Sequence, residues 1–293
     1  MKILVTGGRG FIGSHLVERL EQEKQNVVVA DLKDKQPVDI TQFEQLKRLF
    51  EKNKFAVVVH LAAQTGIRRS FAEPELYERA NVLGTINVLE CLRKSPETRL
   101  VFASSSSVYG DSKVIPFRED DPILAPLSVY AATKRAAELA CQIYARHYGI
   151  RITILRLFTV YGPNNRRDMA AFTFTRDILD GKPIRLFGED TRRDFTYVGD
   201  IVAGIRRAME KSVNFEVINL GNSTPVSVRK FIGLIERYAA KKARIIKDKL
   251  QPGEAGVTYA DITKAKRLLD WQPTTSLEQG VEKLVNWFKL TQA

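Results

Sequence analysis

The chain has 293 residues, of which 46 are Lys or Arg and 34 are Asp or Glu, so its formal net charge is +12. With 44% hydrophobic and 27% charged residues it has the composition of an ordinary soluble protein, long enough for a full hydrophobic core. It starts without a signal peptide and contains no run as long as a membrane span, so we expect a cytoplasmic protein with no membrane contact.

The cysteines argue against a disulfide-rich protein, and the distribution of basic residues argues against a nucleic-acid-binding protein. Cys91 and Cys141 lie far apart in helix-like stretches, which excludes a disulfide framework and favours two small core residues. Lys and Arg are spread along the chain as pairs such as Arg206-Arg207, without a basic arm or interleaved aromatic residues. We therefore expect a small anionic substrate and no nucleic-acid partner.

Short apolar strands alternate with helical stretches through the first half of the chain. Strands are predicted at 2–6, 27–31, 55–63, 99–104 and 151–158, and helices at 11–24, 40–53, 75–93 and 127–148. Because these strands are apolar on both faces and separated by helices, they predict a parallel sheet that is covered on both sides.

The alternation becomes looser after Thr159. Helices are predicted at 172–180 and 201–211, and a strand at 215–221 that returns to the sheet. Three more helical stretches, a short strand at 244–246 and a loop at 251–256 complete the tail. The tail has no linker before it, so it predicts a small lobe that caps the sheet rather than a separate domain.

The turn after the first strand, VTGGRGFIGSHL, has the pattern of a dinucleotide site. Gly7 permits a tight turn, Gly10 lets a pyrophosphate approach the backbone, and Gly13 lets helix and strand pack closely, while the helix N-terminus favours the negative charge. Asp31 ends the second strand, eighteen residues after Gly13. It would accept hydrogen bonds from the ribose hydroxyls and repel a 2′-phosphate, which predicts NAD rather than NADP.

The fold class that follows is α/β, a Rossmann-like doubly wound parallel sheet with a smaller, interleaved C-terminal α/β substrate lobe. We expect residues 1–165 to form the NAD-binding domain, which is rejoined by about 196–222. Residues 166–293 would supply mainly the substrate-binding lobe, through about 166–195 and 223–293.

A reaction centre is indicated by YAATK, in which Tyr130 and Lys134 lie one turn apart on the same helix face. A phenol has a pKa of about 10, and a neighbouring ammonium together with a positive nicotinamide would lower it. Such a tyrosine can take the proton of an alcohol while hydride leaves the same carbon. The serine run SSSSVYG offers a hydroxyl to hold that oxygen: Ser105, three residues before VYG, with Ser106 as the alternative.

The chain resembles the extended short-chain dehydrogenase/reductase superfamily in its GxxGxxG spacing, its Asp39-Ile40 pair, HLAAQ after the third strand, Asn81 in NVLGTINV, and YxxxK. The resemblance implies NAD as cofactor, with Asp39-Ile40 at the adenine, and no metal. The cofactor site that it implies consists of Gly7, Gly10, Phe11, Ile12, Gly13, Asp31, Asp39, Ile40, Leu61, Ala62, Ala63, Gln64, Asn81, Tyr130, Lys134 and Phe158.

Over essentially its whole length the chain also resembles the nucleotide-sugar epimerases that act on UDP-glucuronate. The matching stretches are AAQTGIRRS, ASSSSVYG, LSVYAATK, TVYGP, a following arginine with DMA, RDFTYV and QPGE. The resemblance implies a UDP-sugar substrate, a 4-keto intermediate, and return of hydride to the opposite face to give UDP-galacturonate. It also implies a homodimer paired through the helices near 75–93 and 127–148.

The same resemblance assigns a substrate site. The sugar carboxylate would be held by Ser105, Ser106, Ser107, Thr159 and Arg166, and the nucleotide by Arg193 at the diphosphate, Phe187 beside uracil, Glu254 near the ribose, and Arg68, with Tyr130 at the sugar. An arginine fork suits a carboxylate because it can form two parallel hydrogen bonds. The loop GPNNRRDM departs from the family, which commonly has an aromatic residue and a glycine after the proline.

Other activities are alternatives. UDP-glucose/UDP-galactose 4-epimerisation is the nearest, although enzymes of that type typically have asparagine at the position of Thr159. A UDP-glucuronate decarboxylase and a non-catalytic NAD-binding relative are further alternatives, but Tyr130 and Lys134 argue against the second. A 4,6-dehydratase is disfavoured because Ser106 and Ser107 stand where its acidic pair would be.

Overall fold

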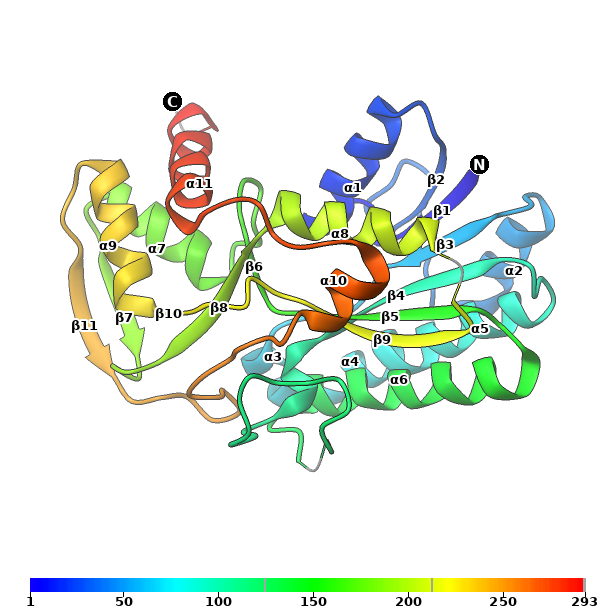
Figure 1. The fold of residues 1–293 in the computed structure, drawn as a ribbon. Helices are drawn as coiled ribbons and strands as arrows, with labels where there is room; N and C mark the ends of the chain where they lie inside the picture. The colour runs from blue at the N-terminus through cyan, green and yellow to red at the C-terminus, as the bar shows by residue number, and fades with distance from the viewer. Residues whose placement is uncertain (124, 212, 292–293) are drawn as a thin grey trace.

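In a computed structural model, which describes residues 1–123, 125–211 and 213–291, six strands form one parallel sheet (Figure 1). Their order across the sheet is β2-β1-β3-β4-β5-β9. The strands are β2 (Asn26–Ala30), β1 (Lys2–Thr6), β3 (Val57–His60), β4 (Arg99–Ser105), β5 (Ile152–Leu157) and β9 (Phe215–Leu220). They are rich in Val, Ile and Leu, which suit strands that are buried on both faces.

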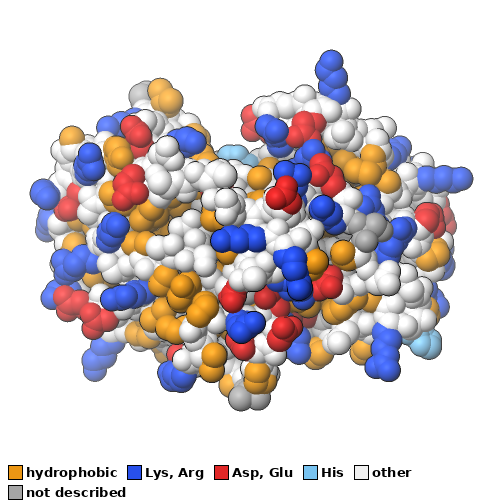
Figure 2. Space-filling view, in the orientation of Figure 1, with side chains coloured by type: hydrophobic (Ala, Val, Ile, Leu, Met, Phe, Trp, Pro, Cys, Tyr) orange, Lys and Arg blue, Asp and Glu red, His pale blue; other side chains and the backbone are white. Residues whose placement is uncertain are grey.

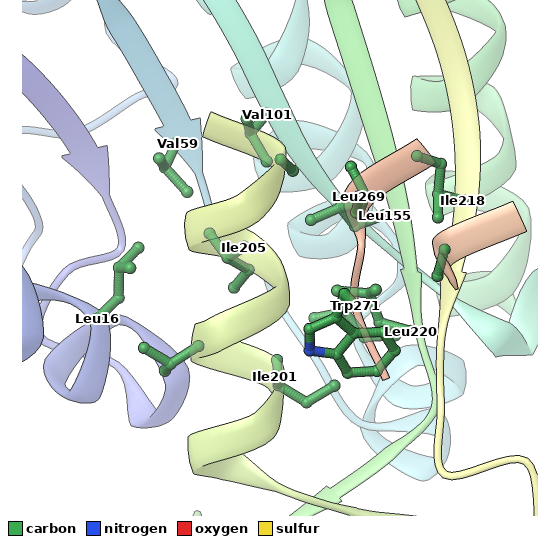
Figure 3. Packing of buried hydrophobic residues seen from close by; sticks show 14 of the residues in the cluster. Leu16, Val59, Val101, Leu155, Ile201, Ile205, Ile218, Leu220, Leu269 and Trp271 are labelled. Atoms are coloured by element: carbon green, nitrogen blue, oxygen red, sulfur yellow. The ribbon is translucent and has the colours of Figure 1, made fainter. Parts of the chain in front are cut away.

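Helices cover both faces of this sheet. One face carries α1 (Phe11–Gln22), α8 (Val198–Glu210) and α10 (Thr263–Leu269), and the other carries α2 (Phe43–Glu51), α5 (Gly84–Arg93) and α6 (Val129–Tyr148) (Figure 1). On the first face, Ile205 of α8 and Trp271 after α10 meet Leu155 of the sheet in one hydrophobic cluster (Figure 3). Through this cluster, residues 260–271 pack against the central sheet.

The winding of the chain reverses between β1 and β3, because β2 lies on one side of β1 and β3 on the other. Open α/β sheets bind ligands in the crevice at the carboxyl ends of the strands at such a point. The turns that follow β1 and β3 meet there. A β-carbon at Gly7 would lie only 2.6 Å from the backbone nitrogen of Ala62, so only glycine lets the two turns come this close.

The remaining elements form a smaller lobe beside the sheet (Figure 1). It contains a three-stranded sheet of β6 (Thr159–Tyr161), β8 (Arg192–Tyr197) and β10 (Pro225–Ser227), the pair β7 (Pro183–Phe187) and β11 (Arg244–Asp248), and the helices α7 (Ala170–Leu179), α9 (Val228–Ala239) and α11 (Leu277–Thr291). Its own core includes the stacked rings of Phe195 and Phe231, with centroids 4.2 Å apart. Because β6 follows β5 after a single residue, the lobe begins at the carboxyl end of the central sheet.

Short helical turns connect the middle of the sheet. After β3 come α3 (Ile67–Ala72) and α4 (Pro74–Glu78), and α4 continues into α5 through a π-helical turn at Arg79–Leu83. A 3₁₀ turn at Ser106–Tyr109 follows β4. π turns are rare and occur frequently at functional sites.

The expected α/β class is confirmed, together with the alternating elements of the first half and the return of β9 to the sheet. In detail, the third strand ends at His60 rather than at 63, and the helix expected at 75–93 contains the π turn. The sequence analysis does not predict β6, β7, β8 and β10, strands of three to six residues that lie outside the main sheet.

The division into domains stays a prediction. Within the range 223–293 assigned to the lobe, α9 and α11 contribute to the lobe core. Residues 260–271, in contrast, contribute Ala260, Leu269 and Trp271 to the cluster on the central sheet. The tail therefore packs against both cores.

The structure also shows where the cysteines and the charged residues lie. Cys91 and Cys141 are free and buried, as expected. On the face shown in Figure 2, lysines and arginines are interspersed with acidic residues instead of forming one patch. In the part of the chain that the structure describes, no helix has the length and apolarity to cross a membrane, and no three His, Cys, Asp or Glu residues are grouped as metal ligands.

Candidate active site

The glycine turn after β1 presents bare backbone at the start of α1. Gly10 is the N-cap of α1, no side chain caps this end, and the first turn contains no acidic residue. A β-carbon at Gly13 would overlap the carbonyl oxygen of Gly7, whose φ is 71°. The N–H groups in the first turn of α1 have no side-chain cap, and the electric field at this end of the helix favours anions. The glycine turn therefore fits the pyrophosphate of a dinucleotide.

The acidic residues predicted for the adenosine half lie beside this turn. Asp31 accepts the backbone N–H groups of Arg9 and Lys33, each at 2.9 Å, so each carboxylate oxygen keeps a lone pair for a further donor. Asp39 is half-buried and accepts the N–H of Thr41. Ile40 is buried, and its side chain packs against Gly84 in the core under α5.

Asn81, in the π turn, fixes the loop Leu61–Gln64 that was assigned to the cofactor. Its amide nitrogen donates to the Gln64 carbonyl and to the Thr133 hydroxyl, both at 3.0 Å, and its oxygen accepts the Gln64 N–H at 2.8 Å. Since Thr133 lies on α6, the buried Asn81 joins this loop to the helix that carries YxxxK. Beneath the loop, burial lowers the pKa of His60 to about 3, so this imidazole, held between two threonine hydroxyls, is neutral.

Tyr130 lies in the first turn of α6, which Ser128 caps by accepting the N–H of Ala131 at 3.1 Å. The Ser105 side chain lies close enough to the Tyr130 phenol to lower the pKa of that phenol, against the effect of burial. Ser105 also caps the 3₁₀ turn, where it accepts the N–H of Ser107 at 3.1 Å. Of the two serines that the sequence left as alternatives, Ser105 is the one that acts on the pKa of the phenol. Its choice as the catalytic hydroxyl stays a prediction.

The electrostatics of this pair differ from the expectation. Burial raises the pKa of Tyr130, and the Ser105 side chain and the positive charge of Arg166 oppose the rise. The expected lowering by the Lys134 ammonium is wrong for the protein alone. Lys134 is itself buried, lies over the Phe102 ring at 4.2 Å from the centroid, and has its pKa lowered by burial to about 8.

The remaining serines of the run have other surroundings. Ser104 donates to Glu138 at 2.6 Å, and Glu138 forms a buried, two-pronged ion pair with Arg156 at 2.9 and 3.0 Å. Ser104 thus belongs to the packing of α6 against the sheet. The Ser107 hydroxyl oxygen is buried with no hydrogen-bond partner among the described residues, as is the side-chain nitrogen of Asn165. Buried polar atoms of this kind are usually satisfied by a ligand or water.

The loop after β6 carries Arg166 towards Tyr130. Pro163 and Asn164 fasten the loop to α1, because the Pro163 carbonyl is 2.9 Å from the His15 ring and the Asn164 amide donates to Ser14 at 3.2 Å. Arg166 is paired with Asp168 of the same loop. The other residues proposed here, Ser106 and Thr159, are half-buried, and the neighbouring Arg167 is exposed.

The four residues predicted to hold the nucleotide come together from four segments. Glu254 lies between two arginines, 3.1 Å from Arg68 and 3.5 Å from Arg193. The Arg68 guanidinium lies over the Phe187 ring, 4.3 Å from its centroid. Burial lowers the pKa of Arg193, which also donates to the Gly256 carbonyl at 3.1 Å. These residues make one cationic and aromatic cluster at the boundary of α3, the lobe and the loop 251–256.

Three further residues predicted for the cofactor site lie in or near the core, and one residue next to Tyr130 was not predicted from the sequence. Phe158 is buried among core rings, 6.4 Å from both Tyr109 and Phe117, while Phe11 and Ile12 are half-buried at the start of α1. Sequence reasoning missed Tyr77, which donates to the carbonyls of Thr65 and Gly66 and meets the Tyr130 ring edge-on. No spacing rule marks such a residue, because its role depends on a tertiary contact.

Comparisons with known proteins agree with this geometry. Residues 3–221 match the NAD dependent epimerase/dehydratase family. A UDP-glucuronate 4-epimerase from Thermodesulfobacterium geofontis is 40% identical over 98% of this chain and 95% of its own. The crystal structure of the Bacillus cereus UDP-glucuronic acid 4-epimerase with UDP-glucuronic acid and NAD superposes with a TM-score of 0.91 at 35% identity, over 99% of this chain and 100% of that one. A Thermotoga maritima UDP-glucose 4-epimerase with UDP-glucose gives 0.95 at 32% identity, over 100% of both chains.

The buried ion pair of Glu138 gives a stability prediction. Glu138→Gln leaves the Arg156 guanidinium buried without its counter-charge, and we expect the free energy of unfolding to fall by about 3 kcal/mol. Glu73→Gln breaks an exposed pair with Arg69, so the free energy of unfolding should change far less than in Glu138→Gln. Urea unfolding followed by circular dichroism measures both. Equal effects of the two substitutions would contradict the assigned importance of the buried pair.

The environment of Lys134 gives a titration prediction. Because its pKa is lowered to about 8, the folded protein should release this proton between roughly pH 7 and 9. The unfolded chain holds the proton longer, so this group makes the folded state more stable as pH rises from about 8 towards 10.5. Lysine side-chain NMR of the cofactor-free protein, with the signal assigned by its loss in Lys134→Met, measures the pKa. A value near 10.5 would refute the prediction.

Proposed function

Because the chain belongs to the NAD dependent epimerase/dehydratase family, we propose that it catalyses the NAD-dependent 4-epimerisation of UDP-glucuronate to UDP-galacturonate. The position of Tyr130 carries this proposal. Ser105 and Arg166 both lie near enough to its phenol to favour the phenolate. A proton acceptor and a carboxylate-binding fork are thus neighbours, as a sugar with a 4-hydroxyl next to a C5 carboxylate requires.

The proposed cofactor site extends from the glycine turn to Lys134. Gly10 and Gly13 leave room for the pyrophosphate at the start of α1, and Asp31 is available to the adenosine ribose. The loop Leu61–Gln64, held by Asn81, closes the crevice at the end of β3. Bound there, NAD would supply a hydride acceptor for C4 of the sugar and later the donor of the same hydride.

The chain's own residues move the proton. Tyr130 takes it from the sugar 4-hydroxyl while Ser105 holds the same oxygen, and Tyr130 returns it after the 4-keto sugar has turned about its diphosphate linkage. Arg166 makes the phenolate accessible at lower pH than burial alone would allow. The sugar can turn because the nucleotide is held separately, by the cluster of Arg68, Phe187, Arg193 and Glu254.

A 4-keto group next to the C5 carboxylate makes the intermediate a β-keto acid, which loses carbon dioxide readily. We assign the carboxylate to Arg166, Thr159 and the hydroxyls of Ser106 and Ser107, of which Ser107 has a buried oxygen without a protein partner among the described residues. Held in this way, the bond to the carboxylate would stay out of alignment with the carbonyl. These carboxylate-binding residues distinguish the proposed epimerase from a UDP-glucuronate decarboxylase.

UDP-glucose/UDP-galactose 4-epimerisation is the second candidate, favoured by the similarity to the Thermotoga maritima structure. A neutral sugar has no charge for Arg166 to meet, so the proximity of Arg166 to Tyr130 supports the glucuronate. A cytoplasmic location is also proposed, and the two free thiols are compatible with its reducing conditions.

We propose in addition that the protein is a homodimer paired through α5 and α6. Large apolar side chains are exposed on these helices and just before them: Leu83, Leu139, Ile143 and Tyr148 are 42%, 44%, 63% and 38% exposed. Leu139 and Ile143 are four residues apart, on one face of α6. Pairing of two copies would bury this face.

The function is tested by offering UDP-glucuronate and UDP-glucose separately to the purified, NAD-loaded protein and identifying products by NMR. We expect UDP-galacturonate from the first with the higher kcat/KM. Tyr130→Phe removes the proton acceptor and should lower kcat by about 10²- to 10⁴-fold, whereas Tyr238→Phe in the lobe should not. Preference for UDP-glucose, or full activity of Tyr130→Phe, would contradict the proposal.

The dimer is tested by Ile143→Glu, which places a charge in the proposed interface and should give monomers. Leu290→Glu changes a leucine that is 82% exposed on α11 and should leave the mass unchanged. Light scattering coupled to size-exclusion chromatography reports the mass of each. A wild-type monomer, or a dimer that survives Ile143→Glu, would refute this interface.

A further inference from the structure

The guanidinium of Arg166 is held by a carboxylate of its own loop. Its Nε donates to Oδ1 of Asp168 at 3.0 Å, and its Nη2 donates to Oδ2 at 2.6 Å. The two hydrogen bonds run side by side, so Asp168 occupies one edge of the guanidinium in the two-pronged geometry typical of arginine and carboxylates. The Arg166 side chain is 30% exposed and that of Asp168 is 59% exposed.

This pairing leaves part of Arg166 free for a second anion. A guanidinium has five N–H donors, and Asp168 uses one on Nε and one on Nη2. Among residues 1–123, 125–211 and 213–291, no group accepts a hydrogen bond from Nη1. The edge formed by Nη1 and the second proton of Nη2 can therefore receive another carboxylate without displacing Asp168.

The Arg166–Asp168 ion pair packs against the backbone of Gly66, next to the reaction centre. A β-carbon at Gly66 would lie 3.3 Å from Oδ2 of Asp168 and 3.5 Å from Nη2 of Arg166, and the φ of Gly66 is 107°, which disfavours any other residue. The Tyr77 hydroxyl fixes this turn by donating to the Gly66 carbonyl at 2.9 Å, and the Tyr77 ring contacts that of Tyr130. Asp168, Arg166 and Tyr130 thus form one connected unit.

We propose that Asp168 is a positioning residue that makes the site selective for a carboxylated sugar, an inference that rests on the proposed function. Asp168 fixes the Arg166 guanidinium in one orientation before substrate arrives, so the rotamer freedom of the arginine is not lost on binding. The remaining edge then meets the sugar carboxylate. A neutral sugar gains nothing from this edge, so its affinity does not depend on Asp168.

The test compares wild type with Asp168→Ala, Asp168→Asn and Asp168→Glu, all loaded with NAD. Calorimetry gives the Kd of UDP-glucuronate and of UDP-glucose, and kcat and KM are measured for UDP-glucuronate. We expect Asp168→Ala to raise the Kd of UDP-glucuronate about tenfold, the scale of ordering one arginine on binding. Asp168→Asn should have a smaller effect because its oxygen keeps one hydrogen bond, and Asp168→Glu should restore most of the affinity. The Kd of UDP-glucose should change less than about twofold, because a neutral sugar has no carboxylate for this edge of Arg166 to meet, and the loss for UDP-glucuronate should appear in KM.

The matched control is Asp180→Asn. Asp180 forms an ion pair with Lys182 at 2.9 Å with the same two-residue spacing, at the end of α7, and its substitution should change none of these quantities. The proposal is overturned if Asp168→Ala tightens UDP-glucuronate, since Asp168 would then be a competitor. It is equally overturned if affinity for both sugars falls alike or neither changes. Wild type that converts UDP-glucose and ignores UDP-glucuronate would instead refute the proposed function, whatever the variants do.

Discussion

The buried ion pair between Glu138 of α6 and Arg156 of β5 holds the reaction centre together. Glu138 also accepts the hydroxyl of Ser104 at the end of β4, so one carboxylate joins a helix to two strands. Lys134 is one helical turn from Glu138, Tyr130 is two turns away, and Ser105 follows Ser104 directly. Burial alone would raise the pKa of Glu138, but Arg156 and Ser104 lower it, so the carboxylate stays ionised. The position of the phenol relative to the serine therefore depends on a contact that takes no part in proton transfer.

Much of this arrangement could be predicted from the sequence because it is local. The glycine turn, Asp31 and the YxxxK pair are set by spacing along one strand, turn or helix, and the structure places them accordingly. The role of Ser104 could not be predicted, since Glu138 is 34 positions away. The raised pKa of Tyr130 also escaped prediction, because burial is a property of the whole fold and here exceeds the effect of one neighbouring charge. The Arg166–Asp168 pair could be seen only once the loop was folded, although both residues stand in the motif.

The two lobes meet at α3 and the loop 251–256. A β-carbon at Gly253 would lie 2.9 Å from the side chains of Ile67 and Phe71, and Arg68 of the same helix reaches Glu254 and Phe187. α3 begins directly after Gly66, on which the Arg166–Asp168 pair is seated. The nucleotide cluster and the proposed sugar site are thus separated by a single helical turn, so a UDP-sugar held at one end would present its hexose at the other.

The contacts of Pro163 and Asn164 with His15 and Ser14 have a consequence for how binding is ordered. The segment that bears Arg166 is tethered to the helix whose amino end would receive the dinucleotide, and not only to the lobe from which it emerges. A shift of α1 on binding a dinucleotide would therefore act on the segment that bears Arg166 through these two hydrogen bonds. Ser14 and His15 would in this way couple the dinucleotide end of α1 to the proposed sugar site through the backbone of one loop.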